Sequence, residues 1–507
     1  MIKLTTINHK HTYELSDIIK MYYGKVEIDY FDENALEYIQ SILEVGDTFL
    51  VSRLEDDSGS LVCISELYDD KGHMTCTETV CKEADEDIDK QIKRCIKKSM
   101  YKLLSNAFSC SFPWGILTGI RPIKLVHEMF DKGFDEVEIE EKLSDSFLIS
   151  NNRVRLAMEI AEIERRHIYP VNPKAVSIYV GIPFCPTRCH YCSFTSNSIK
   201  SCGHYIEEYL ESLISEISQT AIYLKERAIT AQTIYIGGGT PTSLSAEQLR
   251  RLIDCINICF GGGFEEFTCE AGRPDTIDAE KLKVLKQGGI TRLSINPQTM
   301  NEETLKTIGR LHSVMQVIES FELARKHGFD NINMDLIIGL PGEGAAHIKK
   351  TMAAVSELNP ESITIHTMAI KRASILHEGR YSEILKANSA EEMMEYAKSH
   401  MKKIKMKPYY LYRQKHMLQN LENIGFCKPG YECIYNMQII EEKQTNIAFG
   451  ADAVTKAVFL DENRIERQHN IKDLKLYIER VNDMVEAKLK LLKELWETRE
   501  SNNAHRQ

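Results

Sequence analysis

The sequence lacks the features that would point to a membrane, an export route or nucleic acid. No apolar run approaches the roughly 20 residues that a membrane-spanning helix needs, so we expect no membrane span. The opening residues, MIKLTTINHKHTYELSDIIK, have no apolar core followed by a small-residue cleavage site, so we expect a cytoplasmic protein without a signal peptide. The formal net charge of −11 gives bulk nucleic-acid binding no electrostatic support.

The 14 cysteines do not have the pattern of a disulfide-bonded secreted protein. Many of them, such as Cys255, Cys259 and Cys269, lie inside apolar helical or strand patterns, which indicates reduced thiols in a reducing compartment. Hydrophobic residues make up 43% of the chain and charged residues 27%, as in ordinary globular proteins. The length of 507 residues suggests about two to four domains.

From about residue 174, short β-rich runs alternate with longer amphipathic stretches. The runs that predict strands are residues 176–182, 232–237, 265–271, 290–296, 331–338 and 361–370, and the clearest helical patterns between them are 205–226 and 279–289. This alternation predicts a parallel sheet with helices packed outside it. Six such units predict an α/β fold of the partial (β/α)6 barrel type. An open, doubly wound sheet is the alternative, because periodicity alone does not reveal curvature.

The remaining segments have a different character. Residues 86–105 predict a helix with an acidic start and a basic end, and prolines interrupt a helical pattern within IYPVNPK, at 168–174. We therefore expect an α+β N-terminal domain of unknown role at 1–170, the barrel at 171–385, and a helical and mixed C-terminal extension at 386–507. The extension is expected to cover the substrate and to end in one long amphipathic helix at 471–497.

Three cysteines follow the first predicted barrel strand in GIPFCPTRCHYCSF, residues 181–194. Cys185, Cys189 and Cys192 lie at the carboxyl edge of the sheet, where parallel α/β folds place their chemistry. Thiolates are the usual ligands of iron–sulfur clusters, and no fourth cysteine follows nearby. The triplet therefore predicts a [4Fe–4S] cluster with one iron open to another ligand. Unrelated thiols, or a zinc site completed by His190, are the alternatives.

Polar groups also follow the later predicted strands. The stretch GGGTPT, residues 237–242, ends the second strand, and its glycines allow backbone to approach a ligand closely. Further candidates at or near successive strand ends are Glu270, Gln298, Arg310, Asp335 and Ile337. One such group at each strand end indicates a single site on one face of the barrel.

The cysteine spacing resembles that of the radical S-adenosylmethionine (SAM) enzymes. The stretches YVGIPFC, GGGTPT, LSINPQ, LKTIGRLHS and DLIIGLPGE further resemble the oxygen-independent coproporphyrinogen III oxidases and their relatives, the coproporphyrinogen dehydrogenases, over about residues 174–455. The N-terminal region and the segment from MKPYYLYRQKHM onward are most similar to the HemZ-type branch of that family.

The resemblance implies a set of roles. Cys185, Cys189 and Cys192 ligate the cluster. Tyr179 lies beside the cluster and the SAM sulfonium, where it is both a catalytic and a cofactor-binding candidate. Gly238, Thr240 and Glu270 contact the amino-acid end of SAM, Gln298, Arg310 and Asp335 hold its carboxylate and ribose, and Ile337 packs on adenine. The implied reaction, in anaerobic haem biosynthesis, is oxidative decarboxylation of two coproporphyrinogen III propionates to vinyl groups, giving protoporphyrinogen IX. An outside electron donor and acceptor complete it.

The sequence departs from the best-known family members at two positions. Gly181 replaces their histidine, and Phe194 replaces their additional cysteine. Two alternatives from the same superfamily therefore stay open, a haem-binding trafficking protein and an anaerobic haem-processing enzyme. The haem-chaperone branch carries a His-Asn…Tyr-Trp motif near its C-terminus, and this chain has ECIYNMQIIEE there instead.

A basic stretch with interleaved tyrosines spans residues 401–417. A tetra-anionic substrate needs cationic partners, so this stretch predicts a propionate site, with Arg413 as its catalytic-site cation and Lys415 and His416 beside it. A solvated helix end followed by packed tyrosines is the alternative.

Overall fold

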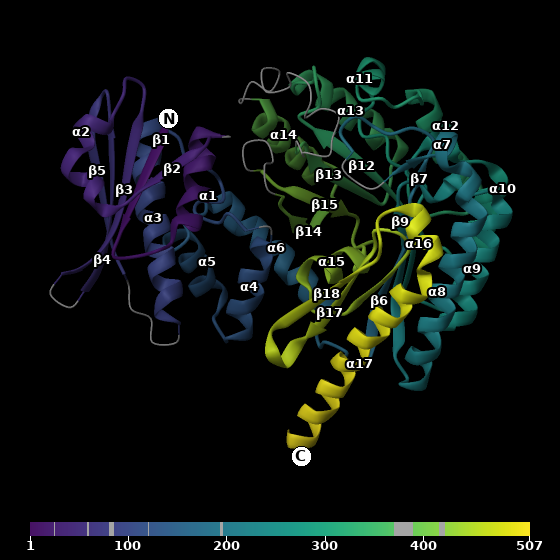
Figure 1. Ribbon diagram of the computed structural model, residues 1–507. Coiled ribbons are helices and arrows are strands. Elements are labelled where there is room, and N and C mark those ends of the chain that lie inside the picture. Colours follow the sequence, from purple (N-terminus) through teal and green to yellow (C-terminus); the bar gives the residue numbers. More distant parts are fainter. Residues whose placement is uncertain are drawn as a thin grey trace. The chain divides into compact units, whose positions relative to one another are not determined.

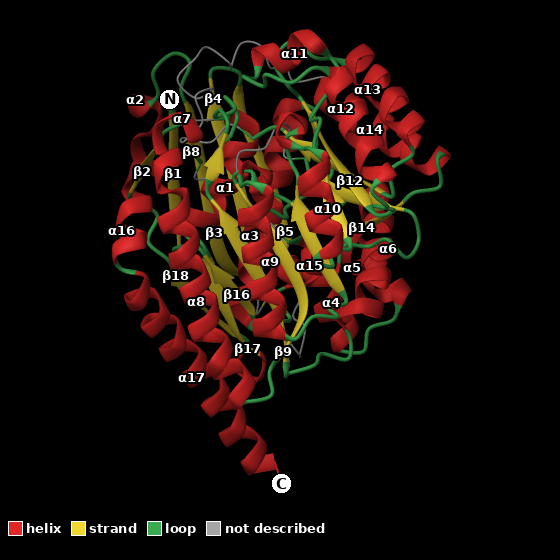
Figure 2. Cartoon of the chain, turned by 90° about the vertical axis from the view of Figure 1, so that its right-hand side faces the viewer, coloured by secondary structure: helices red, strands yellow, loops and turns green. Residues whose placement is uncertain are grey.

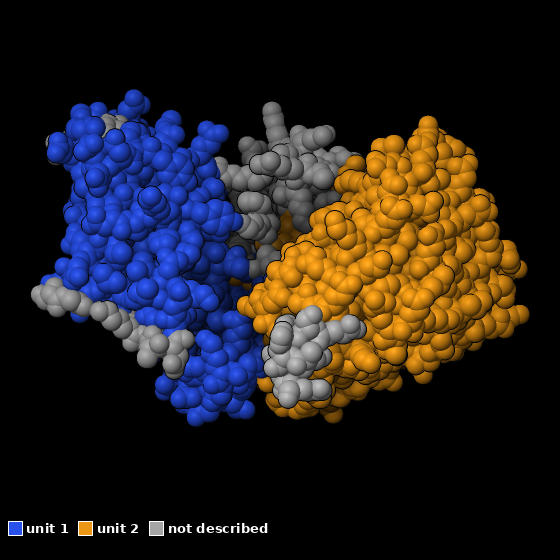
Figure 3. Space-filling view, turned by 60° about the horizontal axis from the view of Figure 1, so that its bottom comes forward, with its two compact units in different colours: residues 1–159, 419–421 blue, residues 160–418, 422–507 orange. Residues whose placement is uncertain are grey.

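The computed structural model describes residues 1–506 apart from 25, 58–59, 81–85, 120, 193–195, 370–388 and 415–420. Phe194, Lys415 and His416 therefore lie outside the described residues. The chain forms two compact units, coloured separately in Figure 3. Unit 1 comprises residues 1–159 and 419–421, and unit 2 comprises 160–418 and 422–507, so the division falls within one helix, α6 (Asn151–Ile168).

Unit 1 is built on a five-stranded mixed sheet in the order β2-β1-β3-β4-β5. Its strands are β1 (Ile2–Ile7), β2 (Ile28–Phe31), β3 (Thr48–Asp57), β4 (Ser60–Asp69) and β5 (Gly72–Thr79), and its helices are α1 (Thr12–Tyr23), α2 (Ile39–Ile42), α3 (Ile88–Phe108), α4 (Pro122–Asp131) and α5 (Glu136–Asp145). The Asp87 side chain caps α3 by accepting from the backbone N–H of Asp89, and the apolar face of α3 packs into the core of the unit. The expected α+β architecture is confirmed.

Unit 2 contains an 11-stranded sheet in the order β14-β15-β13-β12-β11-β10-β9-β6-β16-β17-β18. The six predicted strands are present as β6 (Ala175–Ile182), β9 (Thr230–Gly238), β10 (Glu266–Glu270), β11 (Arg292–Ser294), β12 (Ile332–Ile338) and β13 (Ser362–Thr367), all parallel. The C-terminal region adds strands at both ends: β14 (Lys407–Tyr412) and β15 (Asn423–Cys427) beyond β13, and β16 (Asn446–Phe449), β17 (Val454–Phe459) and β18 (Arg464–His469) beyond β6.

Helices connect the parallel strands, as Figure 2 shows in red. They are α7 (Ile199–Cys202), α8 (Ile206–Glu226), α9 (Ala246–Phe260), α10 (Ala279–Gln287), α11 (Glu302–Thr307), α12 (Val314–Lys326), α13 (Ala345–Leu358) and α14 (Ser389–Lys403). Figure 1 shows α8, α9 and α10 side by side along the outer face of the sheet. Two short strands, β7 (Phe184–Cys185) and β8 (Asn197–Ser198), frame the cysteine loop.

The sheet is curved, and α15 (Ile434–Glu441) lies on its inner side. This helix packs against β14 at one edge and also against β9 and β6, which are six and seven positions further along the strand order. The ring of Tyr435 on α15 lies 4.6 Å from that of Tyr235 on β9, measured between centroids. A flat sheet could not bring such distant strands to one short helix. The partial (β/α)6 barrel is therefore confirmed over the open doubly wound sheet.

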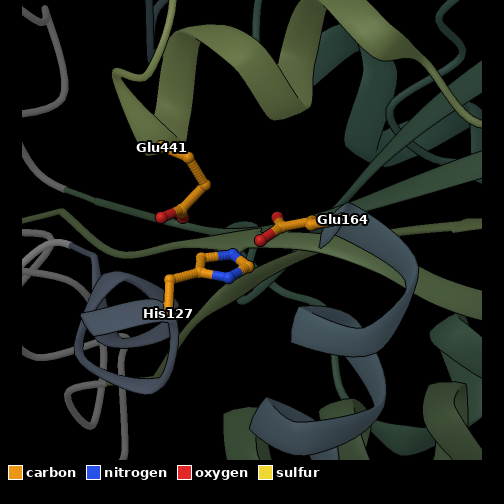
Figure 4. Close-up of side chains that lie close together, drawn as sticks. All are labelled: His127, Glu164 and Glu441. Carbon is orange, nitrogen blue, oxygen red and sulfur yellow. The ribbon is translucent and has the colours of Figure 1, made fainter. Parts of the chain in front are cut away.

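Two buried acidic side chains meet where α15 ends. Figure 4 shows Glu441, the last residue of α15, with its carboxylate close to that of Glu164 on α6. Burial, reinforced by the negative charge of Glu441, raises the pKa of Glu164 well above its usual value. The two carboxyl groups therefore do not both ionise easily at neutral pH.

The C-terminal helical segment differs from the prediction of one long helix. It forms α16 (Leu474–Glu479) and α17 (Val481–Arg506), separated at Arg480, whose backbone has φ −123° and ψ 25°. The Arg480 side chain donates to Asp483 over 2.8 Å and so holds the break. Apolar spacing continues through the break, which is why the periodicity does not reveal it. No helix among the described residues is both long and apolar enough to cross a membrane.

Candidate active site

A cavity of about 620 Å³ opens at the carboxyl ends of the parallel strands of unit 2. A cavity of this size suits a cofactor or another small organic ligand. It brings together the sequence candidates Tyr179, Cys185, Cys189, Cys192, Gly238, Thr240, Glu270, Gln298, Arg310, Asp335 and Ile337, all of which line it. Among the predicted site residues that the structure describes, Arg413 alone is not part of the cavity lining.

The cysteine loop packs tightly on the glycine-rich turn after β9. The backbone N–H of Thr240 donates to the carbonyl of Phe184 over 2.8 Å, and the Thr240 hydroxyl donates to Cys185 Sγ over 3.4 Å. A Cβ atom on Gly239 would lie 2.9 Å from Cys185 Sγ and 2.7 Å from the Phe184 carbonyl oxygen. Glycine is therefore required at this position for the turn to approach the first thiol.

The other side of the cysteine loop is fixed to the segment after α11. The backbone N–H of His190 donates to the carbonyl of Ile308, and Nδ1 of its ring to the carbonyl of Thr307, both over 3.0 Å. Arg310 reaches the same loop, since its Nε donates to the Tyr191 hydroxyl over 3.3 Å. These contacts give the three thiols a firm backbone support.

Glu270 lies at the end of β10 and receives a 2.6 Å hydrogen bond from the Tyr235 hydroxyl on β9. Burial raises the pKa of Glu270 to about 7 from an ordinary value near 4.5, with a smaller contribution from the charge of Asp335. A carboxyl group poised near neutrality can bind an ammonium group and release its proton when it does so. Gly237 must lack a side chain here, because a Cβ would lie 2.9 Å from the Tyr235 ring and 3.2 Å from the Glu270 carboxyl carbon.

Gln298 is the strained residue of the site. Its φ of 68° lies in the left-handed region, which is uncommon for a residue other than glycine. Backbone hydrogen bonds hold it there, with its N–H donating to the Asp335 carbonyl and the Ile337 N–H donating to its own carbonyl, each over 2.9 Å. Within the described part of the chain, its buried Oε1 has no hydrogen-bond partner, as expected of an acceptor reserved for a ligand.

Asp335 is part of a polar chain across the inner wall. Asn333 donates to its Oδ1 over 2.7 Å, His366 Nε2 lies 3.6 Å from its Oδ2, and Tyr412 lies 3.3 Å from the other ring nitrogen of His366. Burial opposes ionisation of Asp335, but the contacts with His366 and Asn333 outweigh it and hold its pKa below the usual value. Asp335 is thus an ionised acceptor at neutral pH.

Arg413 lies just after β14 and is 3% exposed, but its neighbours Tyr412 and Gln414 line the cavity in its place. Successive residues of extended chain point to opposite faces, so the side chain between two cavity residues points away. Tyr410 and Tyr412 of the predicted patch therefore line the cavity, whereas Tyr409 and Arg413 do not.

Several residues that line the cavity were not predicted from the sequence. They include Tyr235, Arg273, Arg292, Asn333, His366 and Tyr435. For some of them the signal was available: Tyr235, Asn333 and His366 belong to predicted strands at alternate positions, and residues two apart on a strand share a face. Tyr435 carries no such signal, because α15 reaches the cavity only through the tertiary fold.

The chain matches the model of the radical SAM superfamily over residues 179–355. It is also 41% identical over 419 residues to the oxygen-independent coproporphyrinogen-III oxidase-like protein HemZ of Bacillus subtilis, covering 82% of this chain and 83% of that one. The chain belongs to this radical SAM family. Members use a [4Fe–4S] cluster and SAM, so the predicted cofactors and the resemblance noted from the motifs are confirmed.

The chain is also similar to two further proteins. The heme chaperone HemW of Bacillus subtilis is 36% identical over 279 residues, covering 55% of this chain and 70% of that one. The structure of the Escherichia coli coproporphyrinogen III oxidase HemN aligns with a TM-score of 0.50 and 22% identity, covering 64% of this chain and 73% of that one. That structural likeness concerns the fold, and the two names point to different activities.

Proposed function

We propose that the protein decarboxylates two of the propionates of coproporphyrinogen III oxidatively, giving protoporphyrinogen IX. The observation that carries this proposal is the single cavity that joins three thiols, polar groups from successive strand ends, and a wall of tyrosines. Each of these two propionates loses carbon dioxide, one hydrogen atom and one electron, and its two remaining carbons become the vinyl group. An external acceptor takes the electron.

The residues of the cavity fit the two cofactors. Cys185, Cys189 and Cys192 would hold the cluster, and the unpartnered Oε1 of Gln298 and the carboxyl group of Glu270 would receive polar groups of SAM. When bound, the cluster and SAM supply the hydrogen-abstracting radical chemistry. The chain itself must orient the substrate and keep water out.

The aromatic wall suits a flat, largely apolar ring system. The rings of Tyr179, Tyr235 and Tyr435 are close to parallel, with interplanar angles of 17° to 25°. Tyr410 and Tyr412 form a second, nearly parallel pair at 10°. Such rings bury apolar area, while the hydroxyl groups of Tyr235 and Tyr412 keep Glu270 and His366 as polar partners.

A carboxylate that enters this cavity needs a cation to offset its desolvation. Arg292 lines the cavity and is 2% exposed. Its Nη1 donates to two neutral acceptors, Asn331 Oδ1 over 3.0 Å and the Tyr431 carbonyl over 3.3 Å. We infer that Arg292, rather than Arg413, provides the charge for a propionate.

Haem binding without decarboxylation is a second candidate function. The similarity to the heme chaperone HemW favours it. So do the departures at Gly181 and Phe194 from the best-known oxidases. Both functions use a tetrapyrrole, so the same cavity would serve either.

Strictly anaerobic turnover separates the two. The reconstituted protein is incubated with SAM, a low-potential reductant and coproporphyrinogen III, and 5′-deoxyadenosine and protoporphyrin are measured together. The proposal expects both products to form in step, with none from a protein that lacks the cluster. Stoichiometric haem binding with no protoporphyrin would instead support the chaperone function.

A matched pair of variants tests the propionate partner. Arg292→Gln is expected to lower porphyrinogen turnover by about tenfold or more, as for loss of a charged hydrogen bond worth about 1.5–3 kcal/mol. Arg413→Gln, equally buried but absent from the lining, serves as the control. SAM binding is expected to be unchanged in both. The reverse result would return the propionate role to Arg413.

A further inference from the structure

Arg273 is a buried cation in the loop after β10, only three residues beyond Glu270. It lines the same cavity as the three cysteines and is 3% exposed. A guanidinium is costly to bury without partners, so its placement calls for an explanation. The sequence motifs give it no role.

The guanidinium of Arg273 holds the cysteine loop at its midpoint. Its Nη1 donates to the carbonyl of Thr187 over 3.0 Å and to the Thr187 hydroxyl over 2.8 Å. Thr187 lies midway between Cys185 and Cys189, two residues from each. Loss of these hydrogen bonds would release the chain segment that sets the separation of the first two thiols.

The opposite side of the guanidinium is paired with a carboxylate. Its Nε donates to Asp275 Oδ1 over 3.0 Å, and Nη2 to Asp275 Oδ2 over 2.8 Å. This two-point pairing fixes the plane of the guanidinium and offsets part of its charge. His312 lies close to both, but its burial, aided by the charge of Arg310, lowers its pKa to about 3 and keeps it neutral. Asp275 is therefore the counter-ion that determines how strongly the positive charge of Arg273 acts on the thiols.

We propose that Arg273 is a positioning residue for the iron–sulfur cluster. Arg273 holds the Cys185–Cys189 loop and raises the reduction potential of the cluster, and Asp275 moderates that effect. The inference rests on the proposed role of the three cysteines as ligands. Reduction adds negative charge to a cluster, so a buried cation nearby favours the reduced state. Arginine stays protonated throughout, so removal of Asp275 leaves its full charge in place.

The test compares Arg273→Gln, Arg273→Lys and Asp275→Asn after anaerobic reconstitution. Iron and sulfide per chain are measured, and the potential is read from a redox titration followed by electron paramagnetic resonance. Arg273→Gln is expected to incorporate less iron and to shift the potential of its loaded fraction to more negative values. Asp275→Asn is expected to shift it to more positive values. Arg273→Lys, which keeps the charge but not the forked geometry, is expected to lose iron with a smaller shift.

The proposal requires that Arg273→Gln and Asp275→Asn shift the reduction potential in opposite directions. If the loaded fractions of both keep the wild-type potential, or both move in one direction, the proposed electrostatic role is wrong. Should Arg273→Gln fail to fold, Asp275→Asn decides the matter alone. Arg250→Gln, at an exposed position of α9, is the control for a generic loss of charge. A Cys185→Ala, Cys189→Ala, Cys192→Ala triple variant that still bound a cluster would refute the ligand assignment instead, independently of Arg273.

Discussion

Nζ of Lys488 on α17 lies 2.5 Å from Oε1 of Glu216 on α8, and both side chains are fully buried. Lys488 also donates to the carbonyl of Ala448 on β16, and Glu216 accepts from the Tyr477 hydroxyl over 2.6 Å. One ion pair therefore joins the C-terminal helices to the first barrel helix and to the strand beside β6.

We expect Lys488→Met to lower the free energy of unfolding by about 3–5 kcal/mol, since it leaves a buried carboxylate without its cation. Chemical denaturation of wild type and variant measures the change. Lys490→Met, at an exposed position of the same helix, provides the control and should be nearly neutral. A loss below about 1 kcal/mol for Lys488→Met would contradict the assigned importance of the pair.

Gly239→Ala should prevent cluster assembly, because the new methyl group would lie within 3 Å of Cys185 Sγ and of the Phe184 carbonyl. Iron per chain after reconstitution measures this. Gly272→Ala is the matched control in the same cavity, since its Cβ would come no closer than 3.5 Å to Asn296. Equal iron content in the two variants would show that the turn tolerates the added atom.

The raised pKa of Glu270, about 7, predicts a pH-dependent affinity for SAM. Below that pH the carboxyl group is protonated and loses its attraction for an ammonium group, whereas above it the group is ionised. Affinity measured by calorimetry should therefore fall as pH drops from 7.5 to 6, at most by about tenfold per unit. Glu270→Gln should bind more weakly, with a flat profile over that interval. A profile in the variant as steep as in wild type would assign the titration to another group.

The left-handed backbone of Gln298 predicts that two substitutions at this position differ in stability although both weaken SAM binding. Gln298→Gly should be more stable than Gln298→Ala by about 1 kcal/mol, because only glycine adopts this conformation without strain. Both variants should bind SAM more weakly, having lost the amide. Thermal unfolding and SAM titration measure the two effects. If alanine proved as stable as glycine, the strain inferred from φ would be absent in solution.

Much of the barrel follows from local signals. Alternation of strands and helices is periodic, and in a parallel sheet the strand ends gather at one edge, so the sequence alone suffices to assign Cys185, Glu270 and Asp335 to one site. The features that the sequence did not predict depend on contacts between residues far apart in the sequence. The direction of the Arg413 side chain depends on the path of the chain just beyond β14, and the strands at both edges of the sheet come from the C-terminal region. The break at Arg480 interrupts no apolar pattern at all.

Because α15 lies on the inner side of the sheet, two different segments of the chain line the cavity. Residues before about 340 provide the cysteine loop and the cofactor candidates, whereas β14 and α15 provide Tyr410, Tyr412 and Tyr435. Mutations that accumulate in the later segment can reshape the space available to a substrate without altering the cysteine loop or the cofactor candidates. Evolution can thus change which ligand the cavity accepts within one inherited scaffold.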